Sequence, residues 1–140
     1  MAHDGQDVMT TQPILSDLLT VTAAAVAPAE AVLAKAQTAV RAMVEVEGRV
    51  SARAVEKEQT ATHGLAWLAT YVESLRQMQK WAEKLNADGK FGEIEQLIHQ
   101  IAFGEYLHQI AGGIQMSQNE IVRLQDLGLG WDALSGFQCD

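Results

Sequence analysis

The best-spaced chemical pair in the sequence is Glu105 and His108, which lie three residues apart in a stretch with helical periodicity. On a helix, this spacing places a carboxylate and an imidazole on the same face, one turn apart. Di-iron bundles use that pair, but they combine two such motifs with two further glutamates from other helices. The sequence holds a single Glu-x-x-His motif, so a complete metal site would need another subunit. Glu105 and His108 are therefore weak metal candidates, and a solvated or capping pair is the favoured interpretation.

His63 and His99 could ligate haem or accept a proton, but neither has a carboxylate at ligand spacing. A histidine at the edge of the core is the favoured interpretation. Trp67, Tyr71 and Trp81 recur along one predicted helix, where they could line a pocket for an apolar ligand. Aromatic residues at such spacings are more typical of packing. The alternative, in which a ligand binds the Trp67 and Trp81 face, stays open.

No motif for nucleophilic or nucleotide chemistry is complete. The sequence has no Gly-x-Ser-x-Gly elbow and no Cys–His spacing suited to a nucleophile. Its glycines at 104, 112 and 113 do not follow a predicted strand, so neither a dinucleotide fingerprint nor a phosphate loop is present. Cys139 is the only cysteine, which excludes disulfides within the chain and fits a reducing cytosol. No catalytic residue and no cofactor within this chain are predicted, and whether it belongs to an enzyme stays open.

An acidic balance limits the classes of partner. The 140 residues carry a formal net charge of −8 and no basic run, which disfavours nucleic acid and anionic membrane surfaces. The first residues contain His3, Asp4 and Asp7 but no Lys or Arg, so no signal peptide is predicted. The charge-free stretch 18–29 is short, and Pro28 should end or kink its helix, so no membrane-spanning helix is predicted. The predicted location is the cytoplasm.

Hydrophobic periodicity predicts an all-α fold, an up-down helical bundle with one long central helix. Residues 1–12 lack an apolar period and are predicted to be a flexible N-terminus, residues 13–127 form the bundle, and residues 128–140 form a Gly-rich C-terminal tail. Ser51 is the predicted N-cap of the long helix, and strand signals are weak throughout. Five helical stretches are expected. The first covers 13–28, the second follows Pro28 and ends at Gly48, and the third and fourth cover 52–86 and 92–111. A short last helix is expected from a capping box at 117–120 to Leu127.

The helix predicted over residues 92–111 is apolar on two nearly opposite faces. The first face carries Ile94, Leu97, Ile98 and Ile101, and the second carries Phe103, Leu107, Ile110 and Ile114. Such a helix needs cover on both sides, from the bundle interior, from a second copy or from a domain outside this chain. The predicted contact surface combines the second face with two aromatic residues of the tail: Phe103, Leu107, Ile110, Ile114, Trp131 and Phe137.

Three stretches in the second half of the chain resemble a known family. They are HGLAWLATYVESLR at 63–76, FGEYL at 103–107 and GIQMSQNEIVR at 113–123. Together they are similar to the N-terminal helical region of bacterial acyl-CoA dehydrogenase-like flavoproteins. The resemblance covers roughly residues 51–127, and it consists of sequence phrases rather than mechanistic motifs.

The resemblance implies a role without chemistry. In that family, FAD and the acyl thioester are held by a middle β domain and a C-terminal helical domain, where a carboxylate removes the α-proton. No flavin-binding or catalytic residue is therefore carried onto this sequence. The implied function is a non-catalytic helical module or subunit of such an oxidoreductase, which packs against itself or a flavoprotein body and helps assembly. The alternatives are a self-associating bundle that binds a metal, haem or apolar ligand, and a plain adaptor protein.

Overall fold

The computed structural model describes residues 12–135, which form four α-helices, two short strand pairs and two 3-10 helices. Residues 1–11 of the segment predicted to be flexible lie outside this range. So does Phe137, a residue of the predicted contact surface. The all-α class is confirmed. The elements are α1 Leu18–Val44, β1 Glu45–Val46, β2 Arg49–Val50, α2 Ala52–Lys57, α3 Gln59–Ala87, α4 Glu93–Gly112, β3 Ile114–Gln115, β4 Ile121–Val122, η1 Leu124–Leu127 and η2 Trp131–Leu134.

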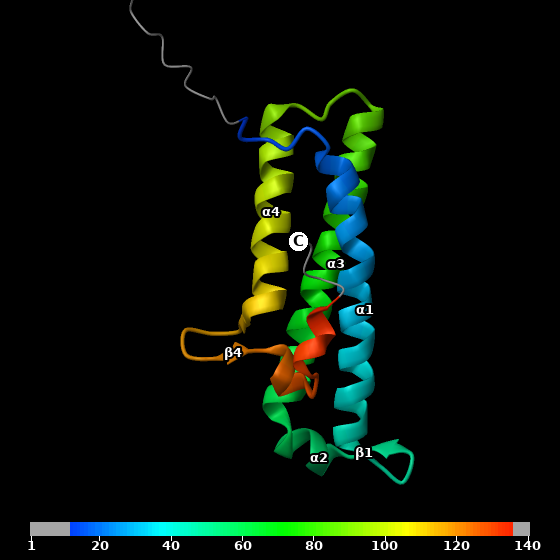
Figure 1. Cartoon of the computed structure of the whole chain (residues 1–140). Coiled ribbons are helices and arrows are strands. Elements are labelled where there is room, and N and C mark those ends of the chain that lie inside the picture. Colours follow the sequence, from blue (N-terminus) through cyan, green and yellow to red (C-terminus); the bar gives the residue numbers. More distant parts are fainter. Residues whose placement is uncertain (1–11, 136–140) are drawn as a thin grey trace, which may run out of the picture.

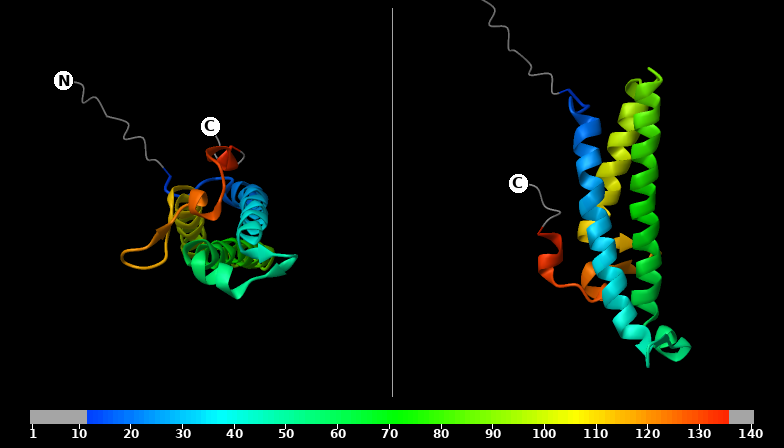
Figure 2. Two further views of the ribbon diagram at one scale, coloured as in Figure 1. Left: turned by 90° about the horizontal axis from the view of Figure 1, so that it is seen from below. Right: turned by 90° about the vertical axis from the view of Figure 1, so that its right-hand side faces the viewer.

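Three long helices, α1, α3 and α4, lie side by side, and α3 contacts both of the others (Figures 1 and 2). The chain descends along α1, returns along α3 and descends again along α4 in the view of Figure 1. Because α4 has 20 residues against 27 in α1 and 29 in α3, it covers only part of their length. The antiparallel β3–β4 pair and η1 follow α4 and contact the remainder of α3. Their buried side chains Val122, Leu124 and Leu127 belong to the same core as those of the helices.

α1 is continuous through Pro28, so the predicted break there is wrong. The missing N–H removes one backbone hydrogen bond and the ring crowds the preceding turn, at a cost of about 3 kcal/mol. Alanines at 23, 24, 25, 27 and 29 surround Pro28 with small side chains that favour a helix. The buried row that runs from Leu18 through Ala29 to Val44 gives α1 its tertiary contacts. This packing outweighs the local cost, because most helical stability in proteins comes from a buried face.

The continuity of α1 also removes the argument from Pro28 against a membrane-spanning helix. By length and composition, α1 is the one helix in residues 12–135 that could cross a membrane, with a mean hydropathy of 1.5 in its most apolar window. The core helix of a soluble protein meets the same criterion. α1 contacts α3, α4 and η1, and 22% of its most apolar window is buried by these contacts within the chain.

The long helix predicted over 52–86 is interrupted at Glu58, whose backbone leaves the helical region (φ −101°, ψ 39°). Ser51 caps α2 as predicted, because its Oγ accepts a hydrogen bond from the Ala54 amide at 3.3 Å. Gly89 follows α3 with a positive φ of 67°, which confirms the predicted stop. The apolar period continues across Glu58, so the pattern does not reveal a single non-helical residue.

The short helix predicted to begin from a capping box at residues 117–120 is wrong, because these residues form the turn between β3 and β4. The Ser117 hydroxyl donates to Glu120 Oε2 at 3.4 Å, a contact between side chains that differs from the side-chain-to-backbone bonds of a capping box, and the Glu120 carbonyl accepts the backbone hydrogen bonds that close the turn. The 3-10 helix η1 begins later, where the Arg123 amide donates to Asp126 Oδ2 at 2.7 Å. Ser and Glu side chains satisfy backbone groups in turns as readily as at helix starts.

Gly64 marks a close approach between α3 and the β3–β4 pair. A Cβ atom at this position would lie 2.4 Å from Cγ2 of Val122, well inside the ordinary carbon–carbon contact distance of about 3.5–4 Å. Val122 is itself buried, with 2% of its surface exposed. The missing side chain therefore allows β4 to lie directly on the helix.

We expect Gly64→Ala to lower the free energy of unfolding by about 1–3 kcal/mol, because the added methyl group must displace Val122 within a closed core. Gly104→Ala is the matched control, since a Cβ atom there meets nothing within 4 Å. This control should gain about 0.5–1 kcal/mol from helix propensity. Urea unfolding followed by circular dichroism measures both variants. Equal gains in stability would contradict the close approach of β4 to α3.

Candidate interaction surfaces

The second apolar face of α4 is turned into the chain's own core. Phe103 and Ile110 of α4, and Ile114, which the structure places in β3 rather than in the helix, are each exposed by 2% or less. They belong to one cluster with buried side chains of α1 and α3. Leu107 is half-buried against the same cluster. The predicted contact surface places these four residues on the outside, whereas the structure uses them to close the interior. They are therefore not available on the surface of this chain as they stand.

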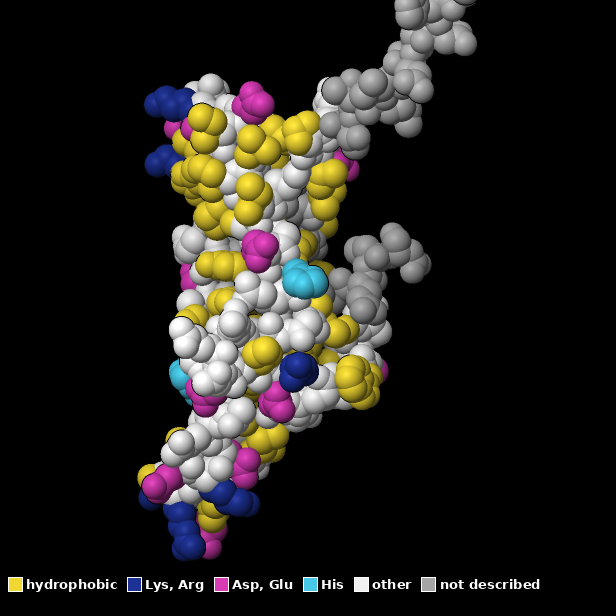
Figure 3. All heavy atoms as spheres, turned by 90° about the vertical axis from the view of Figure 1, so that its left-hand side faces the viewer, with side chains coloured by type: hydrophobic (Ala, Val, Ile, Leu, Met, Phe, Trp, Pro, Cys, Tyr) yellow, Lys and Arg dark blue, Asp and Glu magenta, His cyan; other side chains and the backbone are white. Residues whose placement is uncertain are grey.

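The first apolar face of α4 is the exposed one. Ile94, Ile98 and Ile101 have 68%, 50% and 62% of their surface exposed. Figure 3 shows apolar side chains gathered over the upper part of the face that α4 forms. The sequence predicts two apolar faces on this helix, but it does not tell which one the chain covers, because both faces have the same helical period.

Glu105 and His108 continue this exposed face toward the C-terminal end of α4, and both side chains are exposed. The structure thus places them in solvent rather than at an interior site. Among residues 12–135, no group of three or more His, Cys, Asp or Glu side chains could hold a metal ion. The pair supplies at most two ligands, which is fewer than a protein metal site ordinarily uses.

His99 lies on the buried face of α4 and is fully buried, deeper than the core-edge position predicted for it. Its Nε2 lies 3.0 Å from Oγ1 of Thr22 in α1. The Thr22 hydroxyl donates its hydrogen to the Leu18 carbonyl at 2.8 Å, so the Nε2–H of His99 donates to Thr22. Nδ1 is then an unprotonated acceptor, and it has no hydrogen-bond partner among the described residues. Burial lowers the pKa of His99, and Glu83 partly offsets this effect.

A second polar side chain, Gln79 of α3, contacts α1 near the Thr22 that meets His99. Gln79 of α3 is 6% exposed, and its Nε2 donates to the Leu19 carbonyl of α1 at 3.2 Å and to Glu83 Oε1 at 2.9 Å. We call Thr22, Gln79 and His99 the polar node, because they bring one polar side chain from each long helix to the same part of α1. Hydrogen bonds in a dry interior fix the relative positions of the groups that they join.

The aromatic residues of α3 belong to two separate clusters. Trp67 donates from Nε1 to Nε2 of His63 at 3.1 Å, and its ring meets Tyr71 edge-on with centroids 6.3 Å apart. Tyr71 in turn stacks on Tyr106 of α4 at 4.5 Å. Trp81 lies about 21 Å further along the helix axis and contacts a different aromatic ring, in the loop after α3. Trp67 and Trp81 therefore do not line one common pocket.

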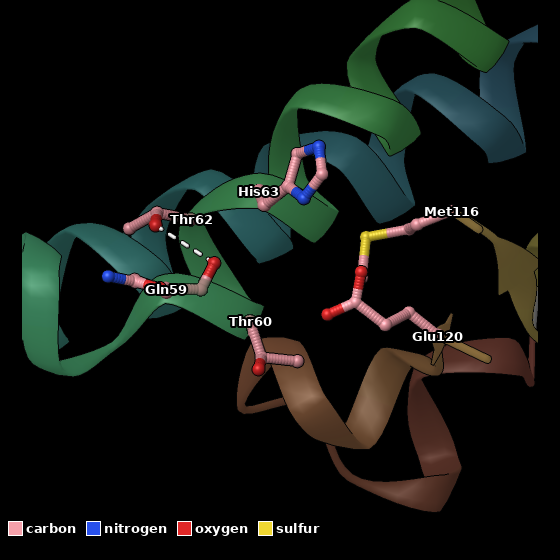
Figure 4. A pocket seen from close by; sticks show the side chains of 6 residues that line it. All are labelled: Gln59, Thr60, Thr62, His63, Met116 and Glu120. Carbon is pink, nitrogen blue, oxygen red and sulfur yellow. Dashed lines mark hydrogen bonds between the residues drawn. The ribbon is translucent and has the colours of Figure 1, made fainter.

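A recess of about 460 Å³ lies between the start of α3 and the β3–β4 pair (Figure 4). In Figure 4 the imidazole of His63 stands on one side, and the Met116 and Glu120 side chains extend from the strand pair on the other. The lining is mostly polar: Gln59, Thr60, Thr62, His63, Met116 and Glu120. A second recess of about 520 Å³ lies beside α2 and includes Arg53 and Lys57.

Neither recess fits FAD. A flavin nucleotide needs apolar or aromatic surface for its rings and positive groups or amides for its pyrophosphate. The recess beside His63 has no basic side chain, and its Glu120 carboxylate would repel a phosphate. The recess beside α2 has two cations, but no aromatic side chain lines it. The resemblance implies FAD in the family, and the residues of these recesses do not supply a place for it.

The C-terminal tail presents Trp131 to the outside. This side chain begins η2 and is exposed by 82%, more than any other large apolar side chain in residues 12–135. Leu129 and Leu134 on either side of it are half-buried against the core. The tail is thus attached through its leucines and leaves its tryptophan uncovered. Large aromatic side chains of this kind are frequent anchors of protein interfaces.

The chain is similar in sequence to part of a known enzyme. The chain is 56% identical over 121 residues to (2S)-methylsuccinyl-CoA dehydrogenase of Cereibacter sphaeroides. The resemblance to an acyl-CoA dehydrogenase-type enzyme is confirmed. The match covers 86% of this chain, which is more than the stretch 51–127 that carries the resemblance in the sequence, and it spans 22% of the length of that enzyme. No protein-family model matches the chain.

Protonation of His99 should destabilise the fold. Burial holds the pKa of His99 below its ordinary value of 6.5, so the unfolded chain binds the proton more tightly than the folded chain. The stabilising contribution is complete above the unfolded pKa and is lost as the pH falls through the folded pKa. We therefore expect the free energy of unfolding to decrease from about pH 7.5 to about pH 5.5.

His99→Gln should lose this part of the pH dependence, because an amide donates to Thr22 without titrating. His108→Gln is the control, since His108 is exposed and should leave the pH dependence unchanged. Urea unfolding at several pH values measures both. The same pH dependence in His99→Gln as in the native chain would contradict the assignment.

Proposed function

We propose that this chain is a non-catalytic helical module of an acyl-CoA dehydrogenase-type flavin oxidoreductase, and that it serves packing and assembly. The observation that carries the proposal is the 56% identity to (2S)-methylsuccinyl-CoA dehydrogenase, which extends over 86% of this chain but over 22% of that enzyme. More than three quarters of the relative therefore has no counterpart in the matched residues. We infer that the enzyme served by this module oxidises (2S)-methylsuccinyl-CoA or a closely similar acyl thioester.

The chemistry of such an enzyme is assigned to its remaining part. When bound, FAD accepts the electrons that the substrate loses, and a base near it takes the α-proton. Glu105 and His108 are in solvent and face no enclosed site, and neither recess of this chain fits FAD. We therefore place FAD and the acyl thioester outside this module, which supplies surface and shape.

The alternation of α1, α3 and α4 supports an up-down bundle over residues 13–127, with residues 128–140 as a Gly-rich tail. We infer a cytoplasmic module that neither inserts into a membrane nor binds nucleic acid. Its net charge of −8 supports this inference, because anionic lipids and phosphate backbones repel such a surface. The contacts of α1 with α3 and α4 support it further, because they bury a row of side chains from Leu18 to Val44 along that helix.

The tail is the surface that we assign to the enzyme body. Trp131 is exposed by 82% next to leucines that already hold the tail on the core, so it is presented on a fixed support. A tryptophan left in water gains about 1.5–3 kcal/mol or more when a partner covers it. The predicted contact residue Phe137 follows in the same tail.

A chimera of the Cereibacter sphaeroides enzyme tests the proposal. We expect replacement of its matched segment by this chain to preserve flavin content and dehydrogenase activity, because a packing module supplies shape rather than reacting groups. In this chimera, Glu105→Gln together with His108→Gln should change kcat by less than about twofold. A loss of kcat on the order of a thousandfold, with flavin content and assembly intact, would show that the module takes part in catalysis.

Trp131→Ala in the same chimera should weaken the contact between the module and the enzyme body by about 1–3 kcal/mol, because the indole loses its buried area. We expect faster proteolytic release of the module and a lower melting temperature at unchanged kcat. Val50→Ala is the matched control, because Val50 is exposed by 64% on β2, away from the tail. Equal effects of the two substitutions would remove the tail as the contact.

A further inference from the structure

The exposed isoleucines of α4 form a continuous seam. Ile94, Ile98 and Ile101 follow each other at spacings of four and three, which is the spacing of a coiled-coil contact line. At 100° per residue their directions agree within about 60°. More than half of the surface of Ile94 and Ile101, and 50% of that of Ile98, remains exposed, so no described element covers this seam.

Opposite charges lie at the two ends of the seam. Lys90 lies in the loop that leads into α4, four residues before Ile94, and Glu105 follows Ile101 by four residues. Both side chains are exposed, and neither takes part in an ion pair within residues 12–135. Glu93 also lies near the first end, but its direction is about 100° away from that of Ile94. Along its own line the seam therefore has one lysine before the isoleucines and one glutamate after them, while Glu93 and Glu95 lie to its sides.

In Figure 3, basic and acidic side chains both lie at the upper edge of this face, and acidic and histidine side chains lie below the upper apolar ones. The seam itself runs from Lys90 through the isoleucines to Glu105. A surface of this kind is complementary to itself when a second copy is turned end for end. The two basic ends then meet the two acidic ends.

We propose that the seam of α4 binds the same seam of a second copy of this chain, with the two helices antiparallel about a two-fold axis. An axis that passes between Leu97 and Ile98 places Ile94 beside Ile101 of the second copy. The same register places Lys90 beside Glu105 of the second copy, and the two-fold axis repeats each contact. Such an isologous contact closes on itself and forms a dimer.

A parallel arrangement does not have these properties. It would place Lys90 beside Lys90 and Glu105 beside Glu105, and like charges in contact oppose association, all the more so on an acidic chain. The antiparallel register thus follows from the charges, and the isoleucines supply the apolar area. Three isoleucines are fewer than a standard interface of about 800 Å² per partner contains, so we expect a weak dimer with a Kd of roughly 10–100 μM.

This inference deepens the proposed assembly role by naming a second copy as the partner at α4, while the tail faces the enzyme body. Its test uses the 140-residue chain alone, and the flavin and activity of the chimera do not enter it. A failure of the dimer therefore leaves the module proposal standing, and a failure of the chimera leaves the dimer measurable. In an assembled enzyme, linkage through the body would raise the effective concentration of a weak contact.

Charge reversal at the ends of the seam tests the register. In an antiparallel dimer, Lys90→Glu and Glu105→Lys each replace two attractive pairs by two repulsive ones. We expect each variant alone to dimerise about tenfold more weakly than the native chain in sedimentation equilibrium. An equimolar mixture of the two variants should recover dimerisation, because opposite charges then meet at both ends. The double variant should recover it as well.

Glu105→Lys separates the effect of the register from that of net charge, because it also reduces the net negative charge of the chain. Stronger dimerisation of Glu105→Lys than of the native chain would show that net charge, and not this register, governs association, and would overturn the proposal. Ile98→Glu should abolish the dimer, whereas Val50→Glu makes the same change on β2 and should leave it intact.

A native chain that stays monomeric up to about 500 μM, well above the expected Kd, would also overturn the proposal. So would a dimer that tolerates Ile98→Glu, because association would then use another face. If the chain is monomeric while Ile98→Glu weakens the chimera, the enzyme body rather than a second copy occupies the seam. Circular dichroism of each variant establishes that the fold is intact.

Discussion

The rotation of α4 about its own axis decides which of its two apolar faces is buried. It therefore also decides which apolar side chains of this helix are exposed to partners. His99 fixes that rotation, because its Nε2–H needs an acceptor and finds the Thr22 hydroxyl of α1 at 3.0 Å. Phe103 and Ile110 lie on the same face and are buried with it. If α4 turned to bury its isoleucines, the hydrogen bond between His99 and Thr22 would be broken, and such a bond contributes about 0.5–1.5 kcal/mol to stability. The exposed seam is thus the counterpart of the buried side of α4 that carries His99.

The shortness of α4 sets the second constraint. Its 20 residues span about 30 Å, while α1 and α3 extend about 40 Å, so the last turns of α1 and the first turns of α3 need other cover. The β3–β4 pair and η1 provide it, and Gly64 lets Val122 lie directly on α3. The same segment then leads into η2, whose leucine-anchored position exposes Trp131. Both candidate surfaces therefore result from how the chain compensates for a short and amphipathic fourth helix.

The sequence predicts the elements of this fold better than their relations. The all-α class, the Ser51 cap, the stop at Gly89 and the two apolar faces of α4 follow from local patterns, and the structure has them. The continuity of α1 at Pro28 depends on tertiary packing that outweighs a local cost, and the break at Glu58 leaves the apolar period intact. The sequence also does not decide which face of α4 is outside, because that choice depends on a hydrogen bond between residues 77 positions apart.

The described polar groups of this chain join helices or lie in solvent. A reacting site needs several polar groups that converge in a partly closed space. Here the buried polar groups are used to join helices, as His99 and Gln79 do, and the exposed pair Glu105 and His108 stands on a convex helix face. Convex helices with an apolar line and charged ends bind other helices well and small molecules poorly. A helical module of this shape is therefore suited to contact with neighbouring helices.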